Sequence, residues 1–300
     1  MKVHQSLSVV LSVVVTLGSA LLFSCATDKG SLDSAYVSEI EQWRHNRLQR
    51  LRGPLSWLSL IGRHQLNAGA NSVGTRDTND VRLPGDIPME FGTIVIDSSG
   101  LAMYGADVRL LLEDGSEFIG GRIEISDPPY IHYGALYWTF LERAGQYYFR
   151  VWDTLSPARG ELNSIPVYPV NPDWKIDVTF SPADSGATII LDDIQGEKRP
   201  NEIIGYVSGE WRDTVFTLMA LDGGEEELFM IIEDATTDIE TYPGGRYMYI
   251  PRADSLGKTV MDFNKAYTPP CAFTEFATCL LPPRENRLPF AVRAGERVLH

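Results

Sequence analysis

Residues 135–153, ALYWTFLERAGQYYFRVWD, determine the class of fold that this sequence adopts. Branched and aromatic residues stand on both sides of Ala144-Gly145, and residues of these types favour β-strands. A short break that ends in glycine between two such runs is typical of a β-hairpin turn. We therefore predict two antiparallel strands, at 135–143 and 146–153, joined by a tight turn.

The pattern continues on both sides of this hairpin. Short runs rich in branched residues recur, and each is bounded by Gly, Pro, Asp or Ser. Many short strands at turn-bounded intervals are typical of antiparallel sandwiches and barrels. We predict a mainly β fold made of antiparallel sandwich or barrel-like units. The further strands are expected at 91–97, 108–112, 117–125, 174–180, 188–191, 203–207, 214–221 and 227–233.

One helix precedes the strands. Apolar residues recur at helical spacing through 36–51, YVSEIEQWRHNRLQRL, and Gly53-Pro54 ends the pattern. Four arginines make the far end of this helix basic, which complements the negative end of the helix dipole. We favour a solvated face over a phosphate-binding face for them, because no glycine-rich loop accompanies the helix. These residues are Arg44, Arg47, Arg50 and Arg52.

The first 24 residues have the features of a secretory signal. Lys2 precedes an apolar run at 7–23, and Leu22-Phe23-Ser24-Cys25 resembles a bacterial lipobox. We predict a signal peptide at 1–24, a lipid on Cys25 and a polar tether at 25–34. The protein would then be anchored by its lipid in the cell envelope, on the periplasmic or extracellular face. The alternative is an uncleaved anchor, because a span begins at about 18 apolar residues.

Two β units are expected after the tether. The first, at 35–155, includes the helix, and the second occupies 174–300. The stretch between them, 156–173, contains four prolines and is the best candidate for a boundary.

The charge balance excludes some partners. The chain of 300 residues has 26 Lys and Arg against 40 Asp and Glu, which gives a net charge of −14. Nucleic-acid binding requires clustered basic residues that neutralise phosphates, so we predict no nucleic-acid partner. The expected partners are the membrane, through the lipid on Cys25, and an unknown small molecule or protein.

The C-terminal third carries a distinctive motif, DFNKAYTPPCAF at 262–273. The segment 262–288 resembles the signature of the DUF1684 family of proteins of unknown function. The resemblance extends over 35–298, so the two β units are expected to form one continuous family domain. It implies a β-rich fold and no established activity. The other blocks that carry the resemblance include WLSLIG at 57–62, GANSVG at 69–74, ATC at 277–279 and PPRENRL at 282–288.

Two cysteines remain once Cys25 is lipidated. An even number of cysteines in an oxidising compartment favours a disulfide, and we predict one between Cys271 and Cys279. Closing so short a loop would stabilise the fold by roughly 2–3 kcal/mol. The alternative is a reactive thiol pair. Because neither C-x-x-C nor H-x-x-x-H spacing is present, we predict no metal site, and we expect no cofactor.

Polar residues of the C-terminal third fit either a functional or a structural role. The structural role is a satisfied hydrogen-bond network that anchors the last segment, with Arg246 paired to Asp234 or Asp262. We favour it slightly. In the functional role, a polar ligand would be bound by Asp234, Thr241, Tyr242, Arg246 and Asn286.

The same region supplies the candidates for catalysis. Asp262 would act as a general base, with Asn264, Tyr267 and Arg246 as positioning groups. No nucleophile elbow, dinucleotide fingerprint or phosphate-binding loop occurs in the sequence. We therefore favour a ligand- or partner-binding or scaffold domain, and keep an anchored hydrolase centred on 262–279 as the alternative.

Overall fold

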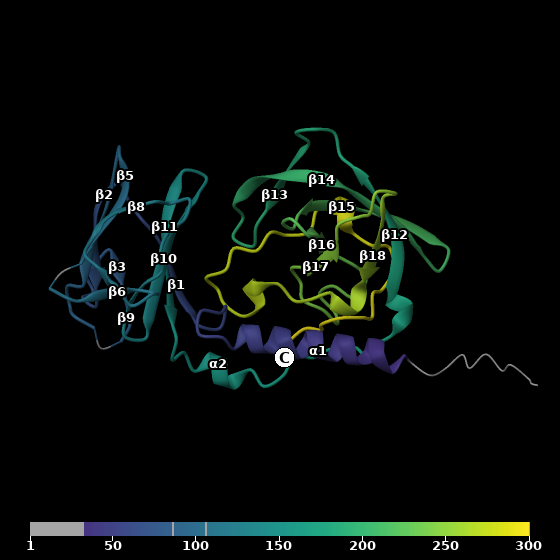
Figure 1. Cartoon of the computed structure of the whole chain (residues 1–300), viewed down its shortest axis with the longest axis horizontal. Helices are drawn as coiled ribbons and strands as arrows, with labels where there is room; N and C mark the ends of the chain where they lie inside the picture. Colours follow the sequence, from purple (N-terminus) through teal and green to yellow (C-terminus); the bar gives the residue numbers. More distant parts are fainter. Residues whose placement is uncertain (1–32, 86, 106, 300) are drawn as a thin grey trace, which may run out of the picture. The chain divides into compact units, whose positions relative to one another are not determined.

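The computed structural model describes residues 33–85, 87–105 and 107–299, and Figure 1 shows their arrangement. The predicted signal peptide, the lipidation site Cys25 and most of the tether lie outside the described residues. None of the described helices is long and apolar enough to cross a membrane.

The hairpin predicted from the sequence is present. Strands β10 (Leu136–Arg143) and β11 (Gln146–Asp153) pair antiparallel over their whole length. The turn residues Ala144 and Gly145 have φ angles of 50° and 76°. Positive φ at both central residues is what a two-residue hairpin turn requires, because this turn follows the right-handed twist of the strands.

This hairpin lies at the centre of a β-sandwich. It belongs to a six-stranded antiparallel sheet in the order β1 (Leu60–Gln65), β11, β10, β9 (Ile131–Tyr133), β6 (Leu110–Leu112) and β7 (Glu117–Phe118). A five-stranded sheet shares its core and has the order β3 (Val81–Arg82), β2 (Gly69–Gly74), β4 (Gly92–Asp97), β5 (Gly100–Gly105) and β8 (Gly121–Ile123). Side chains from both sheets meet in one apolar cluster, which includes Phe91, Ile94, Trp138 and Phe149.

The strand predicted at 117–125 is in fact two short strands, β7 and β8, which belong to different sheets. Gly120, between the strands, and Gly121, the first residue of β8, have φ angles of 87° and 137°. Residues with a side chain rarely adopt such angles, so these glycines allow the chain to leave one sheet for the other.

A second, barrel-like sheet forms the C-terminal part. Its order is β17 (Arg246–Pro251), β16 (Glu227–Ile232), β15 (Thr214–Asp222), β14 (Lys198–Trp211), β12 (Lys175–Pro182) and β18 (Lys258–Asp262), and β13 (Thr188–Asp192) also pairs with β14. The end strands β17 and β18 contact each other, so the sheet is nearly closed (Figure 1). Its core includes Trp174, Phe216, Met248 and Phe263.

The predicted N-terminal helix is α1 (Ser34–Leu51). Asp33 caps it, because its carboxylate accepts a hydrogen bond from the N–H of Ala35 at 3.0 Å. Tyr36, Ile40 and Leu51 are its buried residues. The mainly β fold with one N-terminal helix is thus confirmed. The remaining helices are short: α2 (Ala158–Glu161), η1 (Pro172–Trp174), η2 (Phe263–Lys265), η3 (Pro270–Ala272) and η4 (Arg284–Asn286).

Candidate functional site

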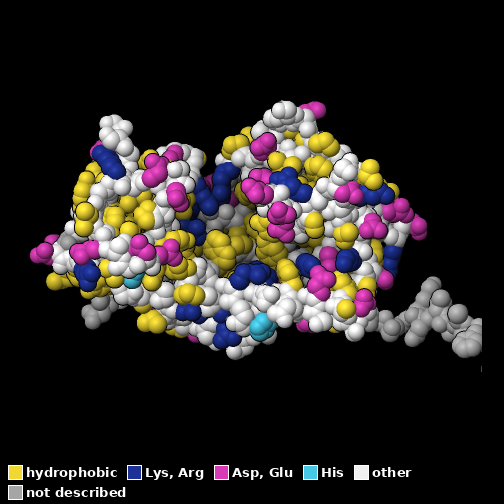
Figure 2. All heavy atoms as spheres, viewed as in Figure 1, with side chains coloured by type: hydrophobic (Ala, Val, Ile, Leu, Met, Phe, Trp, Pro, Cys, Tyr) yellow, Lys and Arg dark blue, Asp and Glu magenta, His cyan; other side chains and the backbone are white. Residues whose placement is uncertain are grey.

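A pocket of about 430 Å³ contains an unusual concentration of arginine for so acidic a chain. Among the described residues that line it there is no Asp or Glu. Figure 2 shows Lys and Arg side chains gathered in a hollow near the middle of the view, beside hydrophobic side chains. The arginines that line the pocket are Arg47, Arg63, Arg143, Arg150 and Arg199.

Three of these arginines lie on one face of the six-stranded sheet. Successive side chains of a strand point to opposite faces, and Phe140 and Phe149 point into the sandwich core. Arg143 and Arg150 therefore lie on the other face. Arg63 of β1 is directly opposite Arg150 in the strand register. Like charges directly opposite each other destabilise a sheet, so this pair requires a compensating interaction.

Within the described residues, Arg150 is in contact with aromatic rings but has no anionic partner. Its guanidinium carbon lies 5.0 Å from the ring centroids of both Trp57 and Trp152. No carboxylate pairs with it in the described part of the chain, and its buried Nε has no hydrogen-bond partner there. Burial, together with the charges of Arg143 and Arg63, lowers the pKa of Arg150 to about 10.

Arg63 and Arg143 also have no carboxylate partner within the described ranges. Arg143 donates a hydrogen bond to the hydroxyl of Thr278, and burial followed by neighbouring arginines lowers its pKa. Arg63 donates to the side-chain oxygen of Gln195. We call Arg63, Arg143 and Arg150 the arginine floor.

The other two arginines of the pocket are paired. Arg47 of α1 contacts both carboxylate oxygens of Glu296, with Nη2 3.2 Å from Oε2, and donates to the Thr268 carbonyl at 2.7 Å. Arg199 of β14 pairs with Asp193. In the described ranges, the pocket arginines without a carboxylate partner are therefore those of the floor.

Aromatic side chains provide a second surface of the pocket. The rings of Phe229 and Tyr247 lie 5.0 Å apart, and those of Tyr249 and Tyr267 are stacked at 6.4 Å. Burial raises the pKa of Tyr267, so its hydroxyl is neutral at physiological pH. We call Phe229, Tyr247, Tyr249 and Tyr267 the aromatic wall. Floor and wall together suit a ligand that has both an anionic and an apolar part.

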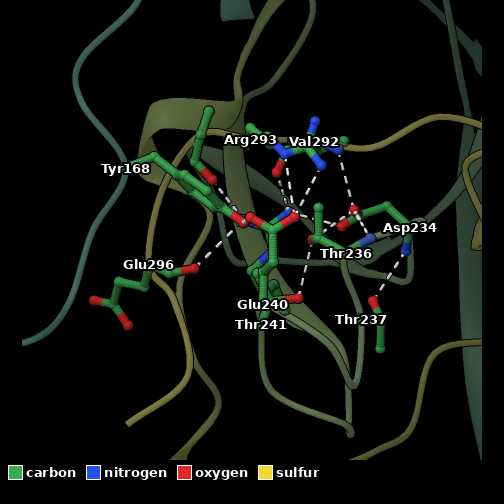
Figure 3. Close-up of polar contacts among 11 residues, drawn as sticks. Tyr168, Asp234, Thr236, Thr237, Glu240, Thr241, Val292, Arg293 and Glu296 are labelled. Atoms are coloured by element: carbon green, nitrogen blue, oxygen red, sulfur yellow. Dashed lines mark hydrogen bonds and ion pairs between the residues drawn. The ribbon is translucent and has the colours of Figure 1, made fainter. Parts of the chain in front are cut away.

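Asp234 and Arg246 form a buried ion pair, one of the two pairings that the sequence suggested. Nη2 of Arg246 lies 2.7 Å from Oδ2 of Asp234, and both side chains are 1% exposed. Arg246 also donates to the Val292 carbonyl at 2.9 Å, and the Val292 N–H donates back to Asp234 at 3.1 Å (Figure 3). The pair holds the C-terminal segment against β17.

The remaining predicted ligand residues lie outside the arginine pocket. Thr241 lies 3.1 Å from Thr236 through their hydroxyl oxygens, within the same network (Figure 3). The buried Asn286 bonds to both backbone groups of Met219, at 2.6 and 2.9 Å. Burial and a hydrogen bond with Cys271 raise the pKa of Tyr242.

Of the four catalytic candidates, Asp262 and Asn264 are in contact, Tyr267 lines the same cavity as Asp262, and Arg246 lies apart. Asp262 accepts hydrogen bonds from the Tyr36 hydroxyl at 2.9 Å and from Asn264, through its N–H at 3.0 Å and its amide at 3.1 Å. Asp262 and Tyr267 line a neighbouring cavity of about 690 Å³, whereas Arg246 lines neither that cavity nor the arginine pocket. Asp262 and Asn264 instead connect α1 to the barrel-like sheet.

The predicted disulfide is not formed in the structure, where Cys271 and Cys279 are both free. The two residues are nevertheless adjacent, because the N–H of Cys271 donates to Sγ of Cys279 at 3.0 Å. A side-chain hydrogen bond with the thiol of Cys271, together with burial, raises the pKa of Cys279. No group of His, Cys, Asp and Glu that could hold a metal occurs among the residues the structure describes.

The sequence analysis missed the arginine floor. Strand alternation in the predicted hairpin already placed Arg143 and Arg150 on one face, opposite the apolar residues. The position of Arg63 on the same face could not be predicted in this way, because the short strand β1 was not predicted.

These observations define a β-sandwich joined to a barrel-like sheet, with a pocket of arginine and aromatic side chains. Residues 160–297 match the family model described as "Protein of unknown function (DUF1684)". The resemblance stated from the sequence is confirmed over these residues. The arginine floor precedes the matched region, and the aromatic wall lies within it.

The chain is also similar to the solution NMR structure of an uncharacterized protein of Haloarcula marismortui. The two are 26% identical, the match covers 47% of this chain and 79% of that chain, and the TM-score is 0.39. No curated protein matches the sequence.

Proposed function

We propose that the protein binds a small anionic ligand that has an apolar part, in the pocket between the arginine floor and the aromatic wall. One observation carries the proposal: three arginines share a sheet face without a carboxylate partner among the described residues, in a chain of net charge −14. Partly buried arginines without a carboxylate partner are energetically unfavourable, and an anion that accepts charge-assisted hydrogen bonds offsets that cost.

The dimensions of the pocket support the same function. Its volume of about 430 Å³ lies within the range that small-molecule sites occupy. Stacked tyrosines offer flat apolar surface at low conformational cost, and the paired Arg47 lies 4.3 Å from the ring of Tyr267.

Calorimetric titration with naphthalene derivatives tests the proposal. We expect a naphthalene anion, offered as carboxylate, sulfate ester or phosphate ester, to bind, and neutral naphthalenemethanol to bind at least tenfold more weakly. Arg150→Gln should weaken anion binding at least tenfold, because hydrogen bonds to charged groups contribute about 1.5–3 kcal/mol. The control is Arg122→Gln, which removes an exposed arginine paired to Asp97 and should leave affinity unchanged. Equal affinity in the Arg150→Gln variant, or no binding of any anion, contradicts the proposal.

We further propose that this domain is lipid-anchored in the cell envelope. The lipobox-like Leu22-Phe23-Ser24-Cys25 supports this location. The polar tether expected at 25–34 would join the lipid to helix α1, whose cap is Asp33.

We also propose that Cys271 and Cys279 become joined after export. Their adjacency supports this pairing, and an oxidising compartment favours it. The link would close segment 271–279, part of which lines the pocket.

Intact mass spectrometry of the membrane-extracted protein tests both proposals. We expect a chain that begins at Cys25 with added lipid mass, and that gains two hydrogen masses on reduction. Cys271→Ser should abolish the gain without changing the lipid mass. A chain that retains residues 1–24 contradicts the anchor, and free thiols in the extracted protein contradict the disulfide.

A further inference from the structure

We infer that the anionic group this pocket recognises is a phosphate monoester attached to a flat aromatic group. This inference depends on the proposed function and narrows it to one chemical class. It rests on the number of unpaired donors, on the charge of the floor and on the shape of the opposite surface.

The number of donors exceeds what a carboxylate uses. A guanidinium has five N–H donors in a planar fork, and one arginine can satisfy a carboxylate in a bidentate pair. Arg63, Arg143 and Arg150 together present far more donors than one such pair needs. Within the described residues, Arg150 makes no side-chain hydrogen bond, and Arg143 bonds only to Thr278. A phosphate monoester has three terminal oxygens, which matches several arginines better than two oxygens do.

The charge of the floor leads to the same class. Asp193 and Glu296 pair with Arg199 and Arg47. The charges of Asp193 and Glu197 also act on Arg143 without contacting it, so the three floor arginines have no paired carboxylate among the described residues. A carboxylate or sulfate ester supplies one negative charge, whereas a phosphate monoester carries about −1.5 to −2 at pH 7. The cross-strand repulsion between Arg63 and Arg150 is therefore best relieved by the dianion.

The surface around the floor favours a flat apolar group. Trp57 stacks on Arg150 from one side, and Phe273 and Phe276 of the C-terminal segment also line the pocket. An aromatic ring makes offset or edge contacts with such side chains. Inorganic phosphate would use the floor alone and leave the aromatic wall without a partner.

Titration of four probes at pH 7.5 tests this inference: 2-naphthyl phosphate, 2-naphthyl sulfate, 2-naphthoate and inorganic phosphate. We expect the phosphate ester to bind at least tenfold more tightly than each of the others. Arg143→Gln should reduce this preference for the phosphate ester over the sulfate ester, while Arg122→Gln should preserve it. A preference that survives Arg143→Gln unchanged contradicts the role of the floor.

The pH dependence provides a second readout. The second pKa of a phosphate ester is about 6, so its affinity should rise between pH 5 and 7.5 as the dianion forms. The sulfate ester stays monoanionic in this range. It therefore reports any titration of the protein groups near the floor, which include Asp193, Glu197, Glu296, Tyr148 and Cys279.

The outcomes separate this inference from the proposed function. If the phosphate and sulfate esters bind equally with the same pH profile, the phosphate assignment is wrong and anion binding stands. Inorganic phosphate that binds as tightly as the naphthyl ester contradicts the aromatic part. Failure of all four probes overturns the inference and, together with the naphthalene series above, the proposed function.

Discussion

Replacement of Asp234 by alanine is expected to lower the free energy of unfolding by about 3–5 kcal/mol. The substitution leaves the guanidinium of Arg246 without its counterion at a position that is 1% exposed. It also removes the acceptor for the N–H groups of Thr236 and Val292. Chemical denaturation, followed by tryptophan fluorescence, measures the change.

Two further variants make this prediction specific to the buried pair. Asp97→Ala breaks the exposed pair with Arg122, and we expect no measurable change in unfolding. The double variant Asp234→Ala with Arg246→Met removes both charges and should recover part of the lost stability, because no unpaired charge remains buried. A loss below about 1 kcal/mol for Asp234→Ala would mean that the pair contributes no more than a surface ion pair.

Gly295→Ala is expected to destabilise the protein by at least about 2 kcal/mol. Gly295 has a φ of 77°, and a Cβ there would lie 2.3 Å from the carbonyl oxygen of Ala266 and 2.8 Å from that of Phe263. Backbone atoms cannot rotate away as a flexible side chain would. The C-terminal segment must therefore shift, together with the adjacent Glu296 that holds Arg47.

Gly186→Ala is the matched control for this substitution. Gly186 has a φ of 78°, almost the same as Gly295, but no atom lies within 4 Å of its Cβ position. Only the conformational penalty of about 1–2 kcal/mol applies there. Denaturation midpoints of the two variants give the difference, and equal destabilisation would show that the close approach at Gly295 has no effect.

The mainly β fold could be predicted because its central strands alternate between core and surface. The β10–β11 hairpin also has a two-residue turn, Ala144-Gly145, whose glycine readily adopts positive φ. Strand β2 was missed because its sequence, GANSVG, has small and polar residues of low strand propensity. Strand β17 was also missed. It begins with Arg246, whose buried charge is acceptable only because Asp234 lies beside it. This contact forms only when the chain folds, so the local sequence does not reveal it.

The candidate site was harder to predict than the fold. Its residues meet through contacts between distant parts of the chain, such as the bond from Arg143 to Thr278, which are 135 residues apart. The polar C-terminal residues were visible in the sequence, but residue type alone does not distinguish a ligand site from a structural network. The carboxylates of Asp234 and Asp262 bond to groups of the protein itself, whereas the arginine floor has no carboxylate partner among the described residues.

The two surfaces of the pocket come from different parts of the chain, and only one of these parts matches the family model. The arginine floor comes from the sandwich that precedes residue 160, and the aromatic wall comes from the DUF1684 region at 160–297. Under the proposed function, the charged group of the ligand would be recognised by residues before 160, and most of the aromatic contacts would come from residues after 160. A protein that combined the region 160–297 with another sandwich would keep the aromatic wall and lose the arginine floor.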